Sequence, residues 1–186
     1  MDKRIQRRIQ GIIQDSGIRL SRVLEVGGVV GPQSLLRFPE LEQAQRYCLN
    51  LVKFPSDVGI TAVTGNANDM TMFDDASFDL VLSNATLEHD RHFWLSIAEM
   101  QRVTKPGGLL VISVPGYVKG GDTGPGRDRG RRTTTYRVHY RFDFYRFSEQ
   151  AVREVFFAGM EDVEVSAMLV PPRLIGYGRK PAAAAR

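Results

Sequence analysis

The stretch VLEVGGVVG, residues 23–31, decides the fold. An apolar run leads straight into a glycine-rich turn, as happens where a buried strand ends at a ligand. Glycines 27, 28 and 31 allow the backbone to approach a ligand closely, because they carry no side chain. Val29 stands where a further glycine is expected, and a β-branched residue at positive φ is an outlier. Either the turn follows a different path, or the valine side chain occupies ligand space.

Strand-like and helical patterns alternate along the chain. The strand-like runs cover residues 22–26, 47–52, 59–63, 78–83 and 109–114. Residues 91–103 carry apolar side chains on one helical stripe, which stops at Lys105-Pro106-Gly107-Gly108. Nearly continuous apolar strands, such as LLVISV at 109–114, are typical of a parallel sheet covered on both faces. We therefore predict an α/β fold with a doubly wound, mostly parallel sheet and helices on both faces.

The two ends of the chain add further elements. Isoleucines at 5, 9, 12 and 13 predict an amphipathic helix over residues 2–15 that closes near Gly17, so that residues 1–17 form an N-terminal helical segment. Ser148 and Gly159 delimit a last helix over residues 148–158. Two strands, residues 163–170 and 174–179, then finish the chain as an antiparallel pair.

A long loop and an aromatic block separate these parts. Residues 116–135 are predicted to form a flexible, basic, glycine-rich loop, with arginines at 127, 129, 131 and 132. Loops of this length in a compact domain are usually lids, binding loops or disordered. The block HYRFDFYRFS, residues 139–148, follows. Two interpretations of the block remain open, the lining of an acceptor pocket and the packing of the last helix on the sheet.

Length and composition indicate one globular domain, residues 1–186. With 42% hydrophobic and 25% charged residues the chain has an average composition. It shows neither a secretory signal nor a run of about 18 apolar residues, so we expect a cytoplasmic protein without a membrane span. The single Cys48 has no partner for a disulfide or a metal site, and we expect no metal ligands.

The positive charge is unevenly distributed. The formal net charge is +4, and basic residues concentrate in the loop and in the first helix, at Lys3, Arg4, Arg7 and Arg8. Either segment could meet an acidic partner, although solvated charge is the interpretation that we favour for both. The basic loop nevertheless suggests an acidic or phosphate-bearing acceptor.

Three ordered segments resemble the class I S-adenosylmethionine-dependent methyltransferases of the small "type 11" kind. They are VLEVGG with Gly31, GNANDMTMFDDASFDLVLSNATLEH at residues 65–89 and EMQRVTKPGGLLVISVPG at residues 99–116. The resemblance covers residues 23–115, with weaker agreement to the C-terminus. It implies a seven-stranded sheet with one antiparallel strand near its edge, and S-adenosylmethionine as the cofactor.

The resemblance also implies a binding role for each strand exit. The first and fourth exits would hold the methionine part of the cofactor, the second the ribose and the third the adenine. The residues concerned are Glu25, Gly27, Gly28, Val29, Gly31, Asn50, Leu51, Asn66, Ala67, Ser83 and Asn84. Within this set Glu25 would orient the turn or the amino group of the methionine part.

Three residues depart from the family pattern. Asn50 replaces the usual carboxylate at the ribose, which should cost roughly 1 kcal/mol, or several-fold in affinity. Asn66 replaces a common aspartate, and Val29 replaces the middle glycine of the turn. Together they support a second hypothesis, in which the fold is kept and the reaction is lost.

Transfer of a methyl group to oxygen benefits from a base, typically by about 10²- to 10⁴-fold. His89, just past the fourth strand of the predicted sheet, is the first candidate, and His139, at the head of the aromatic block, is the second. A structural role is an equal alternative for each, and His92 is interpreted as structural.

We therefore predict a methyltransferase that acts on a small-molecule or a carrier- or glycan-type acceptor at oxygen. The alternative is a catalytically weak or inactive protein of the same fold that serves as a binding or regulatory partner. A nucleic-acid substrate is disfavoured, because the turn at residues 83–86 lacks the N-P-P-Y-like sequence that grips an extruded base. A dinucleotide-dependent oxidoreductase is disfavoured because the full GxGxxG pattern is absent.

Overall fold

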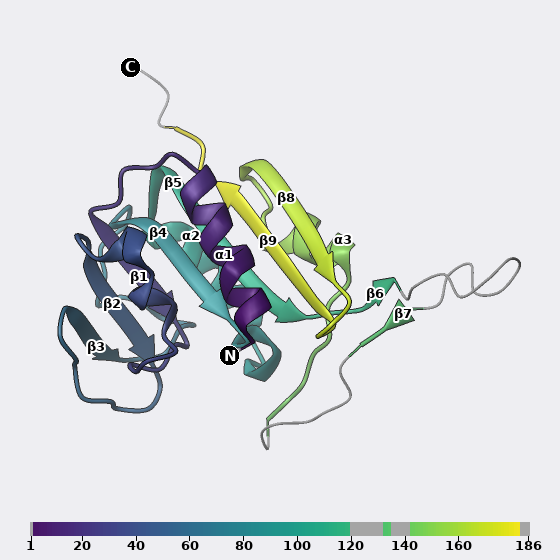
Figure 1. Cartoon of the computed structure of the whole chain (residues 1–186), viewed down its shortest axis with the longest axis horizontal. Coiled ribbons are helices and arrows are strands. Elements are labelled where there is room, and N and C mark those ends of the chain that lie inside the picture. The colour runs from purple at the N-terminus through teal and green to yellow at the C-terminus, as the bar shows by residue number, and fades with distance from the viewer. Residues whose placement is uncertain (1, 120–131, 135–141, 183–186) are drawn as a thin grey trace, which may run out of the picture.

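The computed structural model describes residues 2–119, 132–134 and 142–182. Seven strands form one sheet in the order β3-β2-β1-β4-β5-β9-β8 (Figure 1). These strands are β1 (Arg22–Val26), β2 (Gln45–Asn50), β3 (Ile60–Thr64), β4 (Phe78–Asn84), β5 (Thr104–Pro115), β8 (Glu161–Met168) and β9 (Arg173–Arg179). The first five run parallel, and β9 is antiparallel to both β5 and β8. The seven-stranded, mostly parallel sheet with its antiparallel closing pair is thus confirmed.

The register brings the ends of the parallel strands to one edge of the sheet. Val26 of β1 is paired with Leu49 of β2 and Ser83 of β4. Because β9 runs the opposite way, its first residue, Arg173, pairs with Pro115 at the end of β5. Residues from both ends of the chain can therefore meet at this edge.

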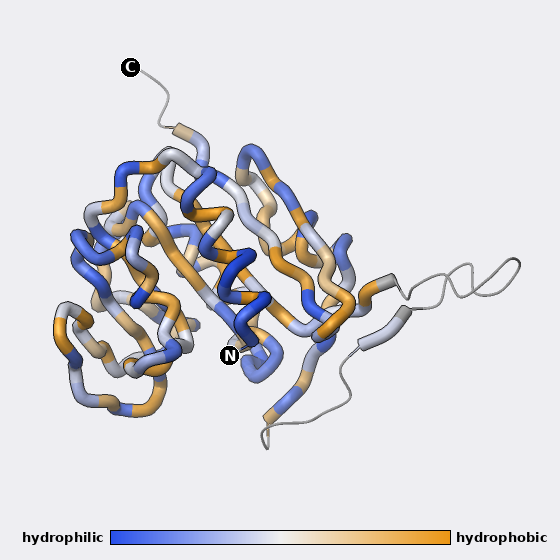
Figure 2. The backbone as a smooth tube through the Cα atoms, viewed as in Figure 1, coloured by the Kyte–Doolittle hydropathy of each residue, from blue (hydrophilic) through white to orange (hydrophobic). Residues whose placement is uncertain are grey.

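Helices cover both faces of the sheet, as predicted. On one face lies α1 (Lys3–Asp15), which buries Ile5, Ile9, Ile12 and Ile13 against the strands. On the other lie α2 (Phe93–Val103) and the last helical segment. Figure 2 shows hydrophilic residues along the outer side of α1, above largely hydrophobic strands. No helix in the described part of the chain has the length and apolar character needed to cross a membrane.

The expected alternation of strands and helices holds only in part. Residues 27–77, all of which the structure describes, contain no α-helix. The connection from β1 to β2 instead forms two 3₁₀ turns, η1 (Leu35–Arg37) and η2 (Pro39–Leu41), and a third, η3 (Leu87–His89), follows β4. Pro39 removes a backbone donor and stops a longer helix. Four apolar residues of this connection still fill the core beneath α1: Leu35, Leu36, Phe38 and Leu41.

The last helical segment is shorter than predicted. It consists of α3 (Glu149–Ala151) and a π-helical turn, η4 (Val152–Phe156). Ser148 caps it as predicted, because its Oγ accepts a hydrogen bond from the Ala151 amide at 3.0 Å. Two short strands, β6 (Val118–Lys119) and β7 (Arg132–Thr133), form a separate antiparallel pair.

Candidate functional site

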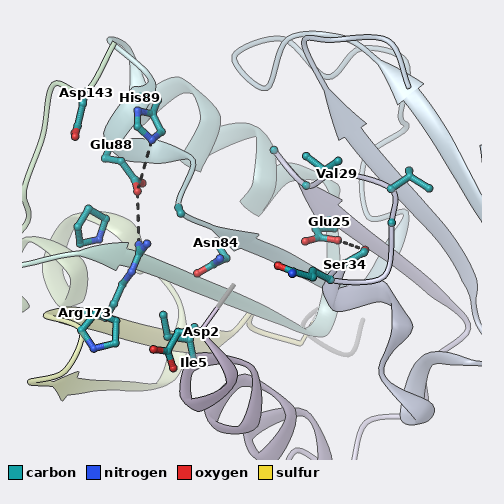
Figure 3. A pocket seen from close by; sticks show the side chains of 18 of the residues that line it. Asp2, Ile5, Glu25, Val29, Ser34, Asn84, Glu88, His89, Asp143 and Arg173 are labelled. Carbon is teal, nitrogen blue, oxygen red and sulfur yellow. Dashed lines mark hydrogen bonds and ion pairs between the residues drawn. The ribbon is translucent and has the colours of Figure 1, made fainter. Parts of the chain in front are cut away.

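A large cavity lies at the edge of the sheet where the parallel strands end (Figure 3). Its volume is about 1040 Å³. The walls come from the turn after β1, the exit of β4, the start of α1, the start of β9 and residues just before α3. The cavity therefore lies where doubly wound sheets bind their ligands.

The glycine turn after β1 is tightly packed against its surroundings. Gly27 adopts φ +77°, and a Cβ there would overlap the side chain of Thr86. A Cβ on Gly28 would overlap the carboxyl group of Glu25. Val29, in contrast, is not among the residues with positive φ, and its side chain is 54% exposed at the cavity. The turn accepts valine because its one strained position falls on Gly27.

Glu25 fastens this turn to the strand from which it comes. Its carboxyl is 3% exposed, and Oε2 accepts a hydrogen bond from the Ser34 hydroxyl at 2.6 Å. Burial raises the pKa of Glu25 to about 6, although the Ser34 hydroxyl and the amides of Leu35 and Leu36 favour the charged form. The carboxyl thus holds the 3₁₀ turn η1 against the end of β1.

The exit of β4 carries a strained residue next to a polar one. Ala85 adopts φ +54°, a left-handed conformation that is costly for a residue with a Cβ and that often accompanies functional sites. Thr86 Oγ1 donates to the carbonyl oxygen of Val26 at 3.2 Å. Asn84 lines the cavity, and its buried Oδ1 has no hydrogen-bond partner among the described residues.

Glu88 is the centre of a buried charged cluster. Its Oε1 lies 3.6 Å from Arg173 Nη1 and 3.9 Å from His89 Nε2. Burial raises the pKa of the Glu88 carboxyl, with the Arg173 charge opposing the shift, and burial lowers the pKa of Arg173. Glu88 Oε2 lacks a hydrogen-bond partner within the described residues. Figure 3 shows Glu88 between His89 and Arg173, across the cavity from Glu25.

The residues before α3 dock onto this cluster. The amides of Phe144 and Tyr145 donate to the carbonyl oxygen of Glu88 at 2.7 and 3.3 Å, and His89 Nδ1 lies 2.5 Å from the carbonyl oxygen of Phe142. The Tyr145 ring packs at 5.0 Å from the ring of Phe93.

Side chains from the same segment also reach the cavity. Asp143 and Arg146 form a largely buried ion pair and line it. In the described part of the aromatic block, Tyr145 and Phe147 therefore pack on the core, whereas Phe142 and Phe144 are exposed. The charged side chains of the block line the cavity.

Seven of the residues singled out from the sequence line the cavity: Glu25, Gly27, Gly28, Val29, Gly31, Asn84 and His89. His139 and the arginines at 127, 129 and 131 lie outside the described residues, as does most of the loop 116–135. The site thus gathers the first and fourth strand exits, with one candidate base.

The other five do not line the cavity: Asn50, Leu51, Asn66, Ala67 and Ser83. Asn50 Nδ2 donates to the carbonyl oxygen of Gly28 at 2.7 Å, and its Oδ1 accepts from the Val52 amide at 3.1 Å. Asn66 Oδ1 accepts from the Asn68 amide at 3.0 Å. Leu51 is 71% exposed. Asn50, Leu51, Asn66 and Ala67 thus lie at the second and third strand exits, whereas Ser83 lies in β4, where its Oγ donates to the carbonyl oxygen of Val26 at 3.2 Å.

Sequence reasoning did not single out Glu88 and Arg173. The available signal for Glu88 was its place in the LEH segment, directly before His89. For Arg173 no local signal existed, because only the pairing of β9 with β5 brings it to the site.

The comparisons with known proteins concern the fold that carries this site. Residues 39–112 match the model of a family described as a methyltransferase domain. No curated protein matches the sequence significantly.

Solved structures of methyltransferases share the fold. A methyltransferase in complex with the Haloferax volcanii Trm112 methyltransferase activator superposes with a TM-score of 0.66 at 17% identity, over 99% of this chain and 97% of that one. Burkholderia thailandensis 1,6-didemethyltoxoflavin-N1-methyltransferase was solved with bound 1,6-didemethyltoxoflavin and S-adenosylhomocysteine. It superposes with a TM-score of 0.67 at 18% sequence identity, over 95% of this chain and 78% of that one. Haemonchus contortus phosphoethanolamine N-methyltransferase 2, in complex with S-adenosyl-L-methionine, superposes with a TM-score of 0.65 at 16% sequence identity, over 94% of this chain and 52% of that one. At such identities the likeness shows the fold.

Proposed function

The chain has the fold of the class I S-adenosylmethionine-dependent methyltransferases, and on this premise we propose that it methylates an oxygen of a small-molecule or a carrier- or glycan-type acceptor. Fold likeness alone does not specify a reaction. The observation that carries the proposal is the cavity, which joins the glycine turn to a buried acid–base cluster.

The residues at the turn suit the cofactor. Gly27, Gly28 and Gly31 present backbone to the cavity, as a zwitterionic methionine part requires. The buried Oδ1 of Asn84, which has no partner among the described residues, suits the ammonium group of that part. We assign these four residues to the methionine end, with Glu25 holding the turn in place and Ser83 supporting it from β4.

The adenosine part is assigned to the second and third strand exits. Asn50 is already bonded to Gly28 through its Nδ2, so it would offer the ribose the second lone pair of its Oδ1. Leu51, which is exposed, would cover the sugar, and Asn66 and Ala67 would face the adenine.

The cofactor, when bound, supplies an electrophilic methyl group on a sulfonium. On the acceptor side, burial raises the pKa of Glu88, which makes its carboxylate a better proton acceptor than an exposed glutamate. His89 lies next to it and Arg173 compensates its charge. We propose that Glu88 and His89 together hold the proton of the acceptor hydroxyl, and we keep His139 as a second candidate base.

A second function is favoured by two features of the turn. Val29 projects into the space beside the cavity, and Asn50 is engaged with Gly28. Both features would weaken cofactor binding. The chain would then act as a binding or regulatory partner, and one structural neighbour was solved with a methyltransferase activator.

Titration with S-adenosylhomocysteine separates the two functions. We expect the wild-type protein to bind this compound and Asn84→Ala to weaken binding by about tenfold, the loss of one hydrogen bond to a charged group. Asn68→Ala, at an amide directed to Asp90 and Ser96, is the matched control. Absence of binding to the wild type, together with no adenosine compound in mass spectra of the purified protein, would overturn the first function and favour the second.

A further inference from the structure

A second cavity lies beside the first, between α1 and the segment after the glycine turn. Its volume is about 250 Å³, and it is lined by Lys3, Gln6, Arg7, Gln10, Pro32, Ser34, Arg37 and Phe38. Pro32 and Ser34 also line the large cavity, so the two are adjacent. We propose that this smaller cavity, the basic groove, binds a phosphoryl group of the acceptor. The proposal rests on the methyltransferase function proposed above.

Two cations of the basic groove have no acidic partner in the part of the chain that the structure describes. Lys3 and Arg7 are exposed and take part in none of the ion pairs found among the described residues. The carboxylate of Glu40, on η2, accepts hydrogen bonds from the amides of Gln10 and Gln14 instead. The positive charge of Lys3 and Arg7 is therefore available to an external anion.

The placement of these charges opposes the stability of α1. Lys3 and Arg7 are spaced i,i+4, where like charges repel each other. Lys3 also lies in the first turn, where the helix dipole disfavours cations and where α1 has no acidic residue. The N-cap Asp2 accepts from the Arg4 amide at 2.8 Å and so offsets the dipole, but it is paired with Arg4 and leaves the repulsion between Lys3 and Arg7 in place. A charge pair that breaks a local rule in this way indicates a functional reason for that face.

The third cation completes a site suited to phosphate. Arg37 donates from Nε to the carbonyl oxygen of Gly31 at 3.0 Å and is paired with Asp57, which fixes its position. Arginine and lysine donors together recognise phosphoryl oxygens through charge-assisted hydrogen bonds.

The two cavities differ in the charge of the ligand group that they can accept. The described wall of the large cavity carries four carboxylates, Asp2, Glu25, Glu88 and Asp143, against the guanidinium groups of Arg146 and Arg173. Asp143 is paired with Arg146, and Glu88 lies 3.6 Å from Arg173, so the guanidinium groups at the described wall of the large cavity already have acidic partners. An anionic group is therefore favoured in the basic groove over the large cavity. The same helix lines both, since Ile5 faces the large cavity and Lys3, Gln6 and Arg7 face the groove. A neutral reacting part and a phosphoryl group of one molecule can occupy the two cavities at once.

The test is a calorimetric titration with inorganic pyrophosphate at low salt, where charge interactions are least screened. The double variant Lys3→Ser/Arg7→Ser should weaken binding by about tenfold or more. Arg8→Ser is the matched control, because Arg8 is exposed on the same helix but does not line the groove. The lower helix propensity of serine offsets the relief of like-charge repulsion, so the double variant should keep the fold, as circular dichroism can check.

Equal weakening in Arg8→Ser, or no binding of pyrophosphate to the wild type, would overturn the proposal. A second experiment measures binding of the protein to vesicles of phosphatidylglycerol. If the double variant alone loses this binding, the ligand is a lipid-linked phosphoryl group. A third experiment measures binding to duplex DNA. If this binding falls equally in all variants, the positive charge of α1 acts diffusely and the proposal is overturned. A parallel titration with S-adenosylhomocysteine reports the proposed function separately.

Discussion

Gly28 and Gly31 occupy the same turn but differ in the space around them. A Cβ on Gly28 would overlap the Glu25 carboxyl, whereas a Cβ on Gly31 would meet nothing within 4 Å. We expect Gly28→Ala to lower the free energy of unfolding by about 1–3 kcal/mol, as overpacking does. Gly31→Ala should leave it unchanged or raise it by about 0.4–1 kcal/mol, because alanine restricts the unfolded chain. Urea denaturation measures both, and similar effects of the two variants would contradict the geometry.

Glu25 should make stability depend on pH. Its pKa is raised to about 6 in the folded protein, from an ordinary value near 4.5, so the folded state binds the proton more tightly. The contribution of Glu25 is therefore fully present below pH 4.5 and is lost as pH rises through 6. The shift corresponds to about 2 kcal/mol.

Glu25→Gln is the variant that isolates this effect. The amide stays neutral and can still accept from Ser34, so its free energy of unfolding should lack the fall between pH 4.5 and 7. Chemical denaturation of both proteins across this range provides the measurement. A constant difference between them over the whole range would show that Glu25 does not titrate there.

Single residues also mark the limit of what the sequence could show. The sequence shows that Val29 replaces a glycine of the family pattern. It does not show whether the backbone or the side chain accommodates the valine. That depends on φ at Gly27, which absorbs the strained conformation, and on Thr86, which follows β4. A sequence pattern predicts which residues form the turn, whereas tertiary contacts determine which of them adopts the strained backbone conformation.

At the scale of elements, Asp79 joins the starts of three strands. Its Oδ2 accepts from the amides of Ser21 and Arg22 at 2.8 and 2.7 Å, and Oδ1 accepts from Lys105 Nζ at 2.7 Å. Although burial opposes ionisation, the Lys105 ammonium and the two amides hold the pKa of Asp79 below its ordinary value. This carboxylate therefore stabilises the junction of β1, β4 and β5.

Asp79→Asn should lower the free energy of unfolding by about 1–3 kcal/mol at pH 7. Because the folded pKa is lowered, the stabilisation exists above the unfolded pKa and is lost as pH falls below about 4. The gap between the two proteins should thus close in acid, as followed by circular dichroism during denaturation. Asp162→Asn, at an exposed carboxylate of β8, serves as the control.

Most elements could be predicted from the sequence because most strands carry an apolar run or an alternation of apolar residues that can be recognised locally. The segment 27–44 could not, since its apolar residues fit a helix as well as the two 3₁₀ turns that form. Here the core beneath α1 and the proline at 39 decide the outcome. The prediction made the last helix too long for a related reason. Its residues continue as a π-helical turn, which the apolar periodicity does not distinguish from an α-helix.

At the scale of the whole molecule, the large cavity depends on residues far apart in the chain. Asp2 of α1 and Arg173 of β9 face the same space as Glu88. The glycine half of the site follows one strand and could be predicted locally. The charged half required the sheet order, in which the antiparallel β9 returns its first residue to the exit of β5.

This assembly predicts that cofactor binding stabilises the molecule as a unit. A ligand that binds only the folded state adds about 2.7 kcal/mol at 100 times its dissociation constant. For a chain of this size that corresponds to an increase in Tm of roughly 5–10 °C. We expect this increase with S-adenosylhomocysteine in a thermal unfolding scan. Neither adenosine nor homocysteine alone should match it, since each would contact only part of the cavity edge.

The variants make the prediction specific to the turn. Gly11→Ala, on α1, should keep the full increase, because its added methyl group meets open space and Gly11 lines neither cavity. Gly28→Ala should lose most of it, since the displaced Glu25 carboxyl would move the backbone that holds the ligand. Each Tm is compared with that of the same variant without ligand, which removes the difference in intrinsic stability. An increase of equal size in Gly28→Ala would place the ligand away from the glycine turn, and no increase in the wild type at millimolar ligand would leave the fold without its proposed cofactor.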